Sequence, residues 1–512
     1  MASRIENSIR NMKYAALGQG IVIAMSFTTR MVFVRYLPVE YLGLNGLFGN
    51  IIAMLNLAEL GVGSSIIYSL YKPLAEKDEE KVAALMRIYK KTYHIIGVVV
   101  AILGIMLLPF LTLLINDPPD ISNMYVIYLL FLLNAVMSYF AIYKQSLIRA
   151  DQQEYIITNY HSIFTVTLNV TQITFLILTR AYLIFLILQI LSTTLFNIVL
   201  AHKVDKKYPY LSMFKQAKLP KADIKTLTRN IRAMMVHKIG GFIVNGTDNI
   251  LLTNLASLVI VGLYSNYLLI INGLWTIYNI IFRSFSASIG NLGATSDEEK
   301  LKFNFNVVNL LGFWLLGFSA ICLYILFTPF ITLWLGEAFL LSAGMVHVIT
   351  LNFYLRGMRL SVLTFHDTLG LFWYGRHKPI FESIINLVFS IFLGIHYGAV
   401  GILLGTTIST FLTCFWIEPY ILYKYGFKSP VREYFIKHIT YSLLCFLSLM
   451  LVQFLVSWIT VAGMIGFITL SVATVFLTNI IFIALFHRTK EFKYLFNIVI
   501  FKLFLGRNDS RG

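Results

Sequence analysis

Apolar stretches follow one another along almost the whole chain. A run of about 18 or more apolar residues can cross the hydrocarbon core of a membrane as a helix. Such runs cover residues 14–37, 42–70, 92–115, 122–147, 159–179, 181–201, 229–255, 258–282, 306–334, 340–374, 379–397, 399–423, 434–458 and 461–486. Only Thr179-Arg180 divides the fifth run from the sixth, and only His396-Tyr397-Gly398 divides the eleventh from the twelfth. The pattern predicts an all-α polytopic membrane protein of about 14 transmembrane helices.

The composition favours lipid as the solvent of the outer surface. Hydrophobic residues make up 58% of the 512 residues and charged residues 13%, whereas soluble domains have about 45–50% and about 25%. A chain of this length has ample room for a soluble core, so the apolar excess indicates a surface that faces lipid. The cysteines Cys322, Cys414 and Cys445 lie in apolar runs without CxxC spacing, which predicts no disulfide framework.

The basic residues predict the orientation of the chain. Of the 41 lysines and arginines, 34 fall in alternate segments beginning with residues 1–13, five fall within spans, and the opposite loops hold only Arg35 and Arg180. This asymmetry predicts an even number of spans with both termini on the cytoplasmic side of the membrane. It also accounts for the net charge of +17 through contact with anionic lipid, so nucleic acid is not an expected partner.

The two halves of the chain repeat. Sliding the sequence by about 219 residues places Gly43-Leu44 on Gly262-Leu263 and Asp78–Lys81 on Asp297–Lys300, and one further residue of shift brings Pro109–Leu113 onto Pro329–Leu333. Each repeat has six spans, so the copies share an orientation, and transporters built from such repeats bind substrate between the halves. The domains expected are an N-lobe at 1–202, a basic linker at 203–228, a C-lobe at 229–424, two further helices at 425–487 and an interfacial tail at 488–512.

Several charges lie deep within predicted spans. They are Arg30, Glu59, Lys238, Asp248, Arg356, Arg359, His366 and Asp367. With His366 neutral, the seven remaining charges would together cost roughly 15–20 kcal/mol if they faced lipid, so they are expected to face protein or a water-filled interior. Arg356, Arg359 and His366 have spacings that would place them on one helix face.

The deep charges predict an anionic substrate. Guanidinium groups match phosphate and carboxylate geometry, so Arg30, Lys238, Arg356 and Arg359 are the candidate ligands of an anionic headgroup. The structural alternative is ion pairing between helices, Arg30 with Glu59 and Arg359 or Lys238 with Asp248 or Asp367, although Arg356 and Arg359 have few acids available. In a further interpretation, Glu59, Asp248, His366 and Asp367 hold these cations or bind a coupling ion.

Signals for chemistry are weak. The histidines have no metal-ligand spacing and no nucleophile, base and oxyanion set is recognisable, so no catalytic residue, metal or cofactor is predicted and the protein is not expected to be an enzyme. Trp275, Tyr278 and Trp373 are candidates for stacking on sugars, with core packing as the alternative.

Along its whole length the chain resembles bacterial polysaccharide-biosynthesis flippases of the multidrug/oligosaccharidyl-lipid/polysaccharide (MOP) superfamily, the superfamily that includes the MATE transporters. The resemblance is sharpest in residues 11–91 and rests on Arg30, Arg35-Tyr36-Leu37, Glu40–Phe48, Leu57–Gly61, Tyr68–Ala75 and Lys378–Ser383. It implies two six-helix lobes plus two C-terminal helices around a cleft with alternating access. It also implies that an undecaprenyl-(pyro)phosphate-linked glycan, such as an O-antigen, capsule or teichoic-type unit, is moved to the outer leaflet.

Membrane lipids, glycan polymerase and ligase machinery, and H⁺ or Na⁺ are further partners that the resemblance suggests. A MATE-like multidrug or metabolite antiporter is the main alternative, and it should rely on acidic rather than basic residues. A membrane-embedded polymerase or ligase is a further alternative. Such enzymes usually carry a large outer loop, whereas the outer loops between the predicted spans of this chain are all short.

Overall fold

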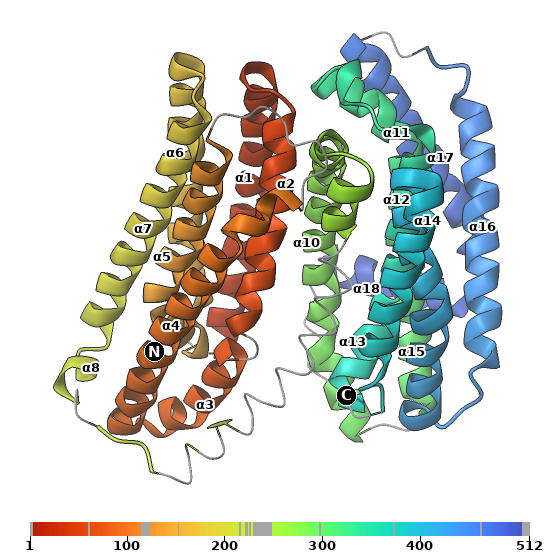
Figure 1. The fold of residues 1–512 in the computed structure, drawn as a ribbon. Helices are drawn as coiled ribbons and strands as arrows, with labels where there is room; N and C mark the ends of the chain where they lie inside the picture. The colour runs from red at the N-terminus through yellow and green to blue at the C-terminus, as the bar shows by residue number, and fades with distance from the viewer. Residues whose placement is uncertain are drawn as a thin grey trace. The chain divides into compact units, whose positions relative to one another are not determined.

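The computed structural model describes residues 4–59, 62–113, 123–151, 153–214, 217–220, 224, 227–228, 248–295, 298–371, 374–460 and 463–503. Within these ranges every secondary-structure element is a helix, which confirms the predicted all-α class. Contacts between residues divide the chain into two units, Met1–Ser265 and Asn266–Gly512. The boundary lies inside one long helix, and each unit is described by itself (Figure 1).

The first unit contains long helices joined by short turns. Its elements are α1 (Arg4–Tyr36), α2 (Glu40–Leu55), the 3₁₀ turn η1 (Asn56–Glu59), α3 (Val62–Glu76), α4 (Glu79–Met106), η2 (Leu108–Leu113), α5 (Met124–Ala150), α6 (Glu154–Thr179), α7 (Tyr182–Lys207) and the short α8 (Tyr210–Met213). Residues 248–255 are also helical. Helix α1 packs along α6, and α5 packs against α4 and α7.

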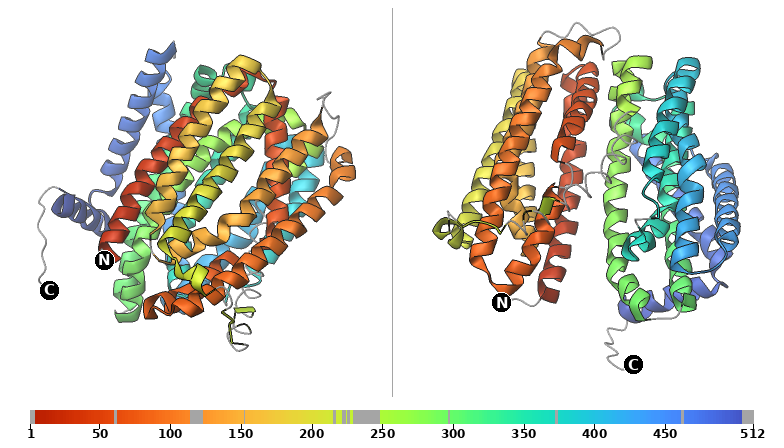
Figure 2. Two further views of the ribbon diagram at one scale, coloured as in Figure 1. Left: turned by 90° about the vertical axis from the view of Figure 1, so that its left-hand side faces the viewer. Right: turned by 60° about the horizontal axis from the view of Figure 1, so that its bottom comes forward.

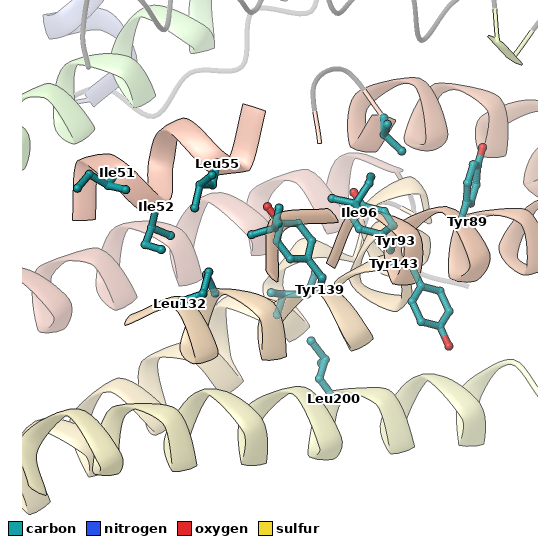
Figure 3. Close-up of a cluster of buried hydrophobic side chains, with 14 of the residues drawn as sticks. Ile51, Ile52, Leu55, Tyr89, Tyr93, Ile96, Leu132, Tyr139, Tyr143 and Leu200 are labelled. Atoms are coloured by element: carbon teal, nitrogen blue, oxygen red, sulfur yellow. The ribbon is translucent and has the colours of Figure 1, made fainter. Parts of the chain in front are cut away.

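The core of the first unit is rich in aromatic residues. Tyr89 and Tyr93 from α4 and Tyr139 from α5 are nearly inaccessible and belong to a cluster of buried side chains that includes Ile51, Ile52 and Leu55 of α2 (Figure 3). Buried tyrosines supply apolar area together with a hydroxyl that needs a partner. The hydroxyls of Tyr93 and Tyr139 therefore form their hydrogen bonds inside the core, at the η1 turn that follows α2.

The second unit holds the elements α10 (Leu258–Thr295, whose first residues belong to the first unit), α11 (Glu298–Trp334), η3 (Glu337–Phe339), α12 (Ala343–Met358), α13 (Leu360–Thr368), α14 (Lys378–Ser409), the π-helical turn η5 (Thr410–Cys414), α15 (Phe415–Ile421), the π-helical turn η6 (Leu422–Gly426), α16 (Arg432–Val456), α17 (Gly463–Phe486) and α18 (Lys490–Leu503). In each unit the long helices run roughly alongside one another (Figure 2).

Two predicted chain reversals are confirmed. Helix α6 ends at Thr179, Arg180 adopts a positive φ of 51°, and α7 starts two residues later. At the second reversal Gly398 has φ of 59° inside α14, so the chain folds back there and Ser390 Oγ donates to the carbonyl of Ile402 across the hairpin. Glycine adopts this left-handed backbone without the steric cost that other residues meet.

Two predicted spans are broken, which corrects the expectation of continuous helices. The run 42–70 divides into α2, η1 and α3, and the run 340–374 divides into α12 and α13 at Arg359. Helices α4 and α11 also begin earlier than the apolar runs 92–115 and 306–334, at Glu79 and Glu298. Acidic residues at a helix N-terminus are stabilised by the helix dipole, so polar sequence extends these helices beyond the apolar core.

Nine helices in the described ranges are long and apolar enough to cross a membrane, judged by length and composition. They match predicted spans three to six, eight, nine, thirteen and fourteen, together with spans eleven and twelve, which are counted as one. Most of predicted span seven lies outside the described residues. The lobe and linker boundaries predicted from the duplication stay predictions.

The C-terminal helix α18 turns away from the direction of α17 (Figure 2). It packs on α11, where the ring of Phe492 stacks on Trp314 at 5.6 Å between centroids and Tyr494 meets Phe303 edge-on. Lys437 of α16 forms a 3.1 Å ion pair with Glu491. These contacts attach the tail to the second unit.

Candidate functional site

Four charged side chains meet in the second unit, two of them buried carboxylates and two half-buried cations. Glu418 accepts hydrogen bonds from Arg359 Nε at 2.9 Å and Arg359 Nη2 at 2.6 Å, and from Lys378 Nζ at 2.5 Å. Glu382 lies farther away, with its oxygens 3.7 Å from Arg359 Nη1 and 3.3 Å from Lys378 Nζ. Two cations and two carboxylates thus form a cluster without net charge, which we call the charge cluster.

Three elements position the charge cluster. Arg359 is the residue at which α12 ends and α13 begins, Lys378 and Glu382 stand one turn apart at the start of α14, and Glu418 lies on α15 between the two π-helical turns. The Glu418 side chain is only 4% exposed and the Arg359 side chain 18%. Charges this deep need partners, and short charge-assisted hydrogen bonds offset part of their desolvation.

A cavity of about 10 Å³ borders the charge cluster. It is lined by Arg359, Cys414 and Glu418 on one side and by Tyr434 and His438 of α16 on the other. Most of the lining is apolar, and Tyr434 and His438 are polar side chains that α16 contributes to it. The cluster therefore has a polar neighbour in α16, which lies beyond the predicted duplication.

Arg356 takes a different environment from Arg359. Its side chain is exposed, and its guanidinium carbon lies 5.0 Å from the ring centroid of Trp275 in α10, a cation–π distance. Arg359 lies at the junction of α12 and α13, and its partner is Glu418 whereas that of Arg356 is Trp275, so the two arginines do not share one set of neighbours. The expectation that Arg359 lacks available acids is wrong, since Glu418 and Glu382 both contact it.

Arg30 lies in α1 of the first unit and is half-buried. Its Nη1 donates to Ser265 Oγ at 2.9 Å, at the end of that unit. A guanidinium has five N–H donors in a planar fork, and the serine takes one of them. Lys238, another of the candidate headgroup ligands, lies outside the described residues.

Glu59 closes the η1 turn after α2. Tyr93 Oη donates to Glu59 Oε1 at 2.7 Å, and one turn earlier Tyr139 Oη donates to Asn56 Oδ1 at 2.6 Å (Figure 3 shows the two tyrosines). The carboxylate is therefore bound by a tyrosine and not by Arg30. Acidic residues inside membrane segments are typical of ion pathways and proton relays.

The other predicted acids and histidine occupy separate places. His366 is buried in α13, with Nδ1 3.3 Å from Oδ1 of the exposed Asp367. Asp248 is half-buried at the start of the helical residues 248–255. Within the ranges that the structure describes, no group of three or more His, Cys, Asp or Glu side chains is arranged to hold a metal ion.

Sequence reasoning missed three members of the charge cluster. Glu382 and Glu418 are acids inside the apolar runs 379–397 and 399–423, which is the same signal that marked Glu59. Lys378 was assigned to the short cytoplasmic segment 375–378, because nothing in the sequence indicates that its side chain turns inward to Glu418. The pairing arises from the hairpin at Gly398, which brings α14 and α15 together.

Long helices with charged side chains among them are also the fold of solved membrane transporters to which this structure is similar. The structure is similar to the lipid II flippase MurJ in an inward closed conformation, with TM-score 0.66 and 13% identity over 92% of this chain and 98% of that chain. It is also similar to an inward-facing multidrug resistance MATE transporter of the MOP superfamily, with TM-score 0.60 and 14% identity over 79% of this chain and 96% of that one.

A third similar structure is the Vibrio cholerae MATE transporter VcmN, with TM-score 0.58 and 14% identity over 83% of this chain and 99% of that chain. At these identities the likeness defines the fold. No family model matches the sequence, and no curated protein matches it.

Proposed function

We propose that the protein is a flippase that moves a polyprenyl-(pyro)phosphate-linked oligosaccharide from the cytoplasmic to the outer leaflet by alternating access. The observation that carries this proposal is the extent of the fold likeness. The lipid II flippase covers 92% of this chain and the two MATE transporters 79% and 83%. The lipid II flippase thus matches about 50 to 70 more residues of this chain than the MATE transporters do, which is about the length of two membrane-spanning helices.

Basic side chains support an anionic headgroup as the substrate. Arg30 and Arg356 are the described candidates, because one is bonded to a neutral serine hydroxyl and the other is exposed on an aromatic ring. Lys238 remains part of the proposal. We leave Arg359 out of headgroup binding and assign it to the charge cluster, because Glu418 already neutralises its charge.

The acidic residues supply candidates for coupling. Glu59, held by Tyr93 at a helix break, is the best placed of them for H⁺ or Na⁺. Asp248, His366 and Asp367 stay in the proposal as secondary positions. The glycan would come from O-antigen, capsule or teichoic-type synthesis in a bacterial cytoplasmic membrane, with polymerase and ligase machinery as downstream partners.

A MATE-like multidrug or metabolite antiporter is the second candidate. The likeness to two MATE transporters over nearly their whole length favours it. The same antiporter should depend on acidic residues and carry cations, so the chemistry of the transported molecule separates the two candidates.

Translocation in proteoliposomes tests the proposal. The purified chain should move a polyprenyl-pyrophosphate oligosaccharide between leaflets, and Arg30→Ala and Arg356→Ala should each slow it about tenfold or more, since a hydrogen bond to a charged group contributes about 1.5–3 kcal/mol. Arg283→Ala is a matched control, because Arg283 is an exposed arginine of α10. Wild-type rates in both variants would refute the headgroup assignment, and an inactive wild type would refute the function.

A further inference from the structure

A second, larger cavity opens beside α16. It has a volume of about 550 Å³ and lies between α16, α11, α12 and the segment of η5 and α15. The lining on α16 runs from His438 to Met450, which is about 18 Å of helix. One leaflet of the hydrocarbon core is about 15 Å deep, so the cavity has the length of one leaflet's lipid chain.

The mouth of the cavity is apolar. Its outer residues include Leu351, Phe411, Leu443 and Phe446, whose exposed fractions are 41%, 40%, 56% and 55%. Because α16 is long and apolar enough to span a membrane, this mouth meets hydrocarbon and not water. The cavity is therefore accessible from the bilayer side.

The interior of the cavity offers water few hydrogen bonds. Tyr354 and Ser442 pair with each other at 3.2 Å, and the ring of Tyr324 stacks on His347. An engineered apolar cavity of about 150 Å³ stays dry and binds benzene, and this one is several times larger. Because the cavity is also open on the side that faces the bilayer, lipid hydrocarbon can enter it.

Two basic residues, Arg432 and Lys424, lie beyond the end of the cavity at His438. Arg432, at the start of α16, is exposed and lies six residues before His438, about 9 Å along the helix. Lys424 is exposed in η6, and its Nζ donates to the hydroxyl of the exposed Tyr420 at 2.9 Å. A lysine beside tyrosines at a membrane surface suits a phosphate headgroup.

We propose that this cavity is a binding site for one acyl chain of an anionic phospholipid, with its phosphate headgroup at Lys424 and Arg432. The lipid fills the space that α16 leaves beside α12 and η5, and so joins the C-terminal helices to the rest of the unit. The cavity adjoins the small cavity beside the charge cluster, since Leu355, Phe411, Phe415 and His438 line both. Its lining includes none of the four charges of that cluster and neither Arg30 nor Arg356.

Photolabelling of the full chain tests the site. The protein is reconstituted in phosphatidylethanolamine vesicles with a minor fraction of phosphatidylglycerol that carries a diazirine in its acyl chain. Labelling should concentrate on residues 438–450 and on the facing turn of α12. Leu443→Trp and Leu351→Trp, on opposite walls, should each lower it about fivefold by filling the space.

The control is Leu447→Trp, an exposed α16 position that does not line the cavity, and it should label as the wild type does. Exchanging Lys424 and Arg432 together for alanine should leave the chain labelled but remove the preference for phosphatidylglycerol over phosphatidylcholine. Unchanged labelling in both tryptophan variants would overturn the proposal. Stronger labelling by a diazirine polyprenyl phosphate at equal mole fraction would also overturn it, because the site would then belong to a carrier lipid.

Discussion

Glu418 receives short hydrogen bonds from Arg359 and Lys378, whereas Glu382 stands more than 3 Å from the same two cations. The two carboxylates should therefore contribute differently to the free energy of unfolding, although both are buried. Removing one partner of a buried ion pair leaves an uncompensated charge and costs about 3–5 kcal/mol.

Glu418→Gln should consequently destabilise the protein by about 3–5 kcal/mol, because two cations lose their closest acceptor. Glu382→Gln should cost clearly less, because neither of its contacts is a short hydrogen bond. Thermal unfolding of both variants in one detergent measures the difference. Equal losses, or a larger loss for Glu382→Gln, would show that the distances in the charge cluster do not govern its stability.

Sequence reasoning identified individual deep charges better than their partners. Arg359 was recognised as a cation that lipid would not tolerate, and it is buried. Its partner Glu418 is 59 residues away, and only the fold brings such residues together. The opposite case is Glu59, whose partner Tyr93 is a neutral hydroxyl that no charge-pairing argument would select.

The hairpin of α14 is the element whose sequence signal was clearest, since Gly398 marks the reversal and two further glycines allow close contact between its arms. A Cβ at Gly405 would lie 2.5 Å from the backbone nitrogen of Ser390, far inside van der Waals distance. A Cβ at Gly344 in α12 would meet its nearest atom at an ordinary 3.4 Å.

Gly405→Ala should therefore destabilise the protein by about 1–3 kcal/mol through overpacking of the hairpin. Gly344→Ala, its matched control, should be neutral or stabilising because alanine favours helix. The melting temperatures of the two variants give the comparison. If Gly405→Ala is as stable as the wild type, the arms of α14 are not in the contact described.

Attachment of α18 depends on pH through Glu491. Burial acts to raise the pKa of this carboxyl, but hydrogen bonds from its own backbone amide and from Lys437 more than offset burial and hold the pKa below its ordinary value. Because the pKa is lower in the folded state, the ion pair stabilises the docked helix fully at pH values above the ordinary glutamate pKa of about 4.3. This stabilisation is lost as the pH falls through the lowered pKa of Glu491 in the folded protein.

A spin label at the exposed position Phe496 should thus report an immobile α18 at neutral pH and a mobile one in acid. Glu491→Gln should be more mobile at neutral pH and show little change on acidification. Equal pH profiles for the two proteins would mean that aromatic packing on Trp314 alone holds the helix.

Element boundaries followed from the sequence where a polar or glycine residue interrupts an apolar run, as at Arg180 and Gly398. The break at Arg359 was not predictable in this way, because apolar residues continue on both sides of it. Arg359 at that break belongs to the charge cluster, which forms only when residues far apart in the sequence come together in the fold. The π-helical turns η5 and η6 likewise have no local sequence signal and lie on either side of the segment that carries Glu418.

At the scale of the whole molecule, hydropathy was sufficient for the class of fold. The apolar runs predicted a helical membrane protein, and the structure has the fold of MOP-superfamily transporters. The nature of the transported molecule is not contained in that fold, because flippases and multidrug transporters share it. It depends on which side chains face the substrate, and those are the residues for which sequence patterns were least informative.

The central claim is that the protein carries a lipid-linked anion. Its most direct test is a side-by-side transport measurement in one preparation of proteoliposomes, with a polyprenyl-pyrophosphate oligosaccharide in one arm and a lipophilic cationic drug in the other. The account predicts translocation of the anionic glycolipid and no transport of the drug above protein-free vesicles. Drug transport without movement of the glycolipid would contradict it and assign the protein to the multidrug antiporters.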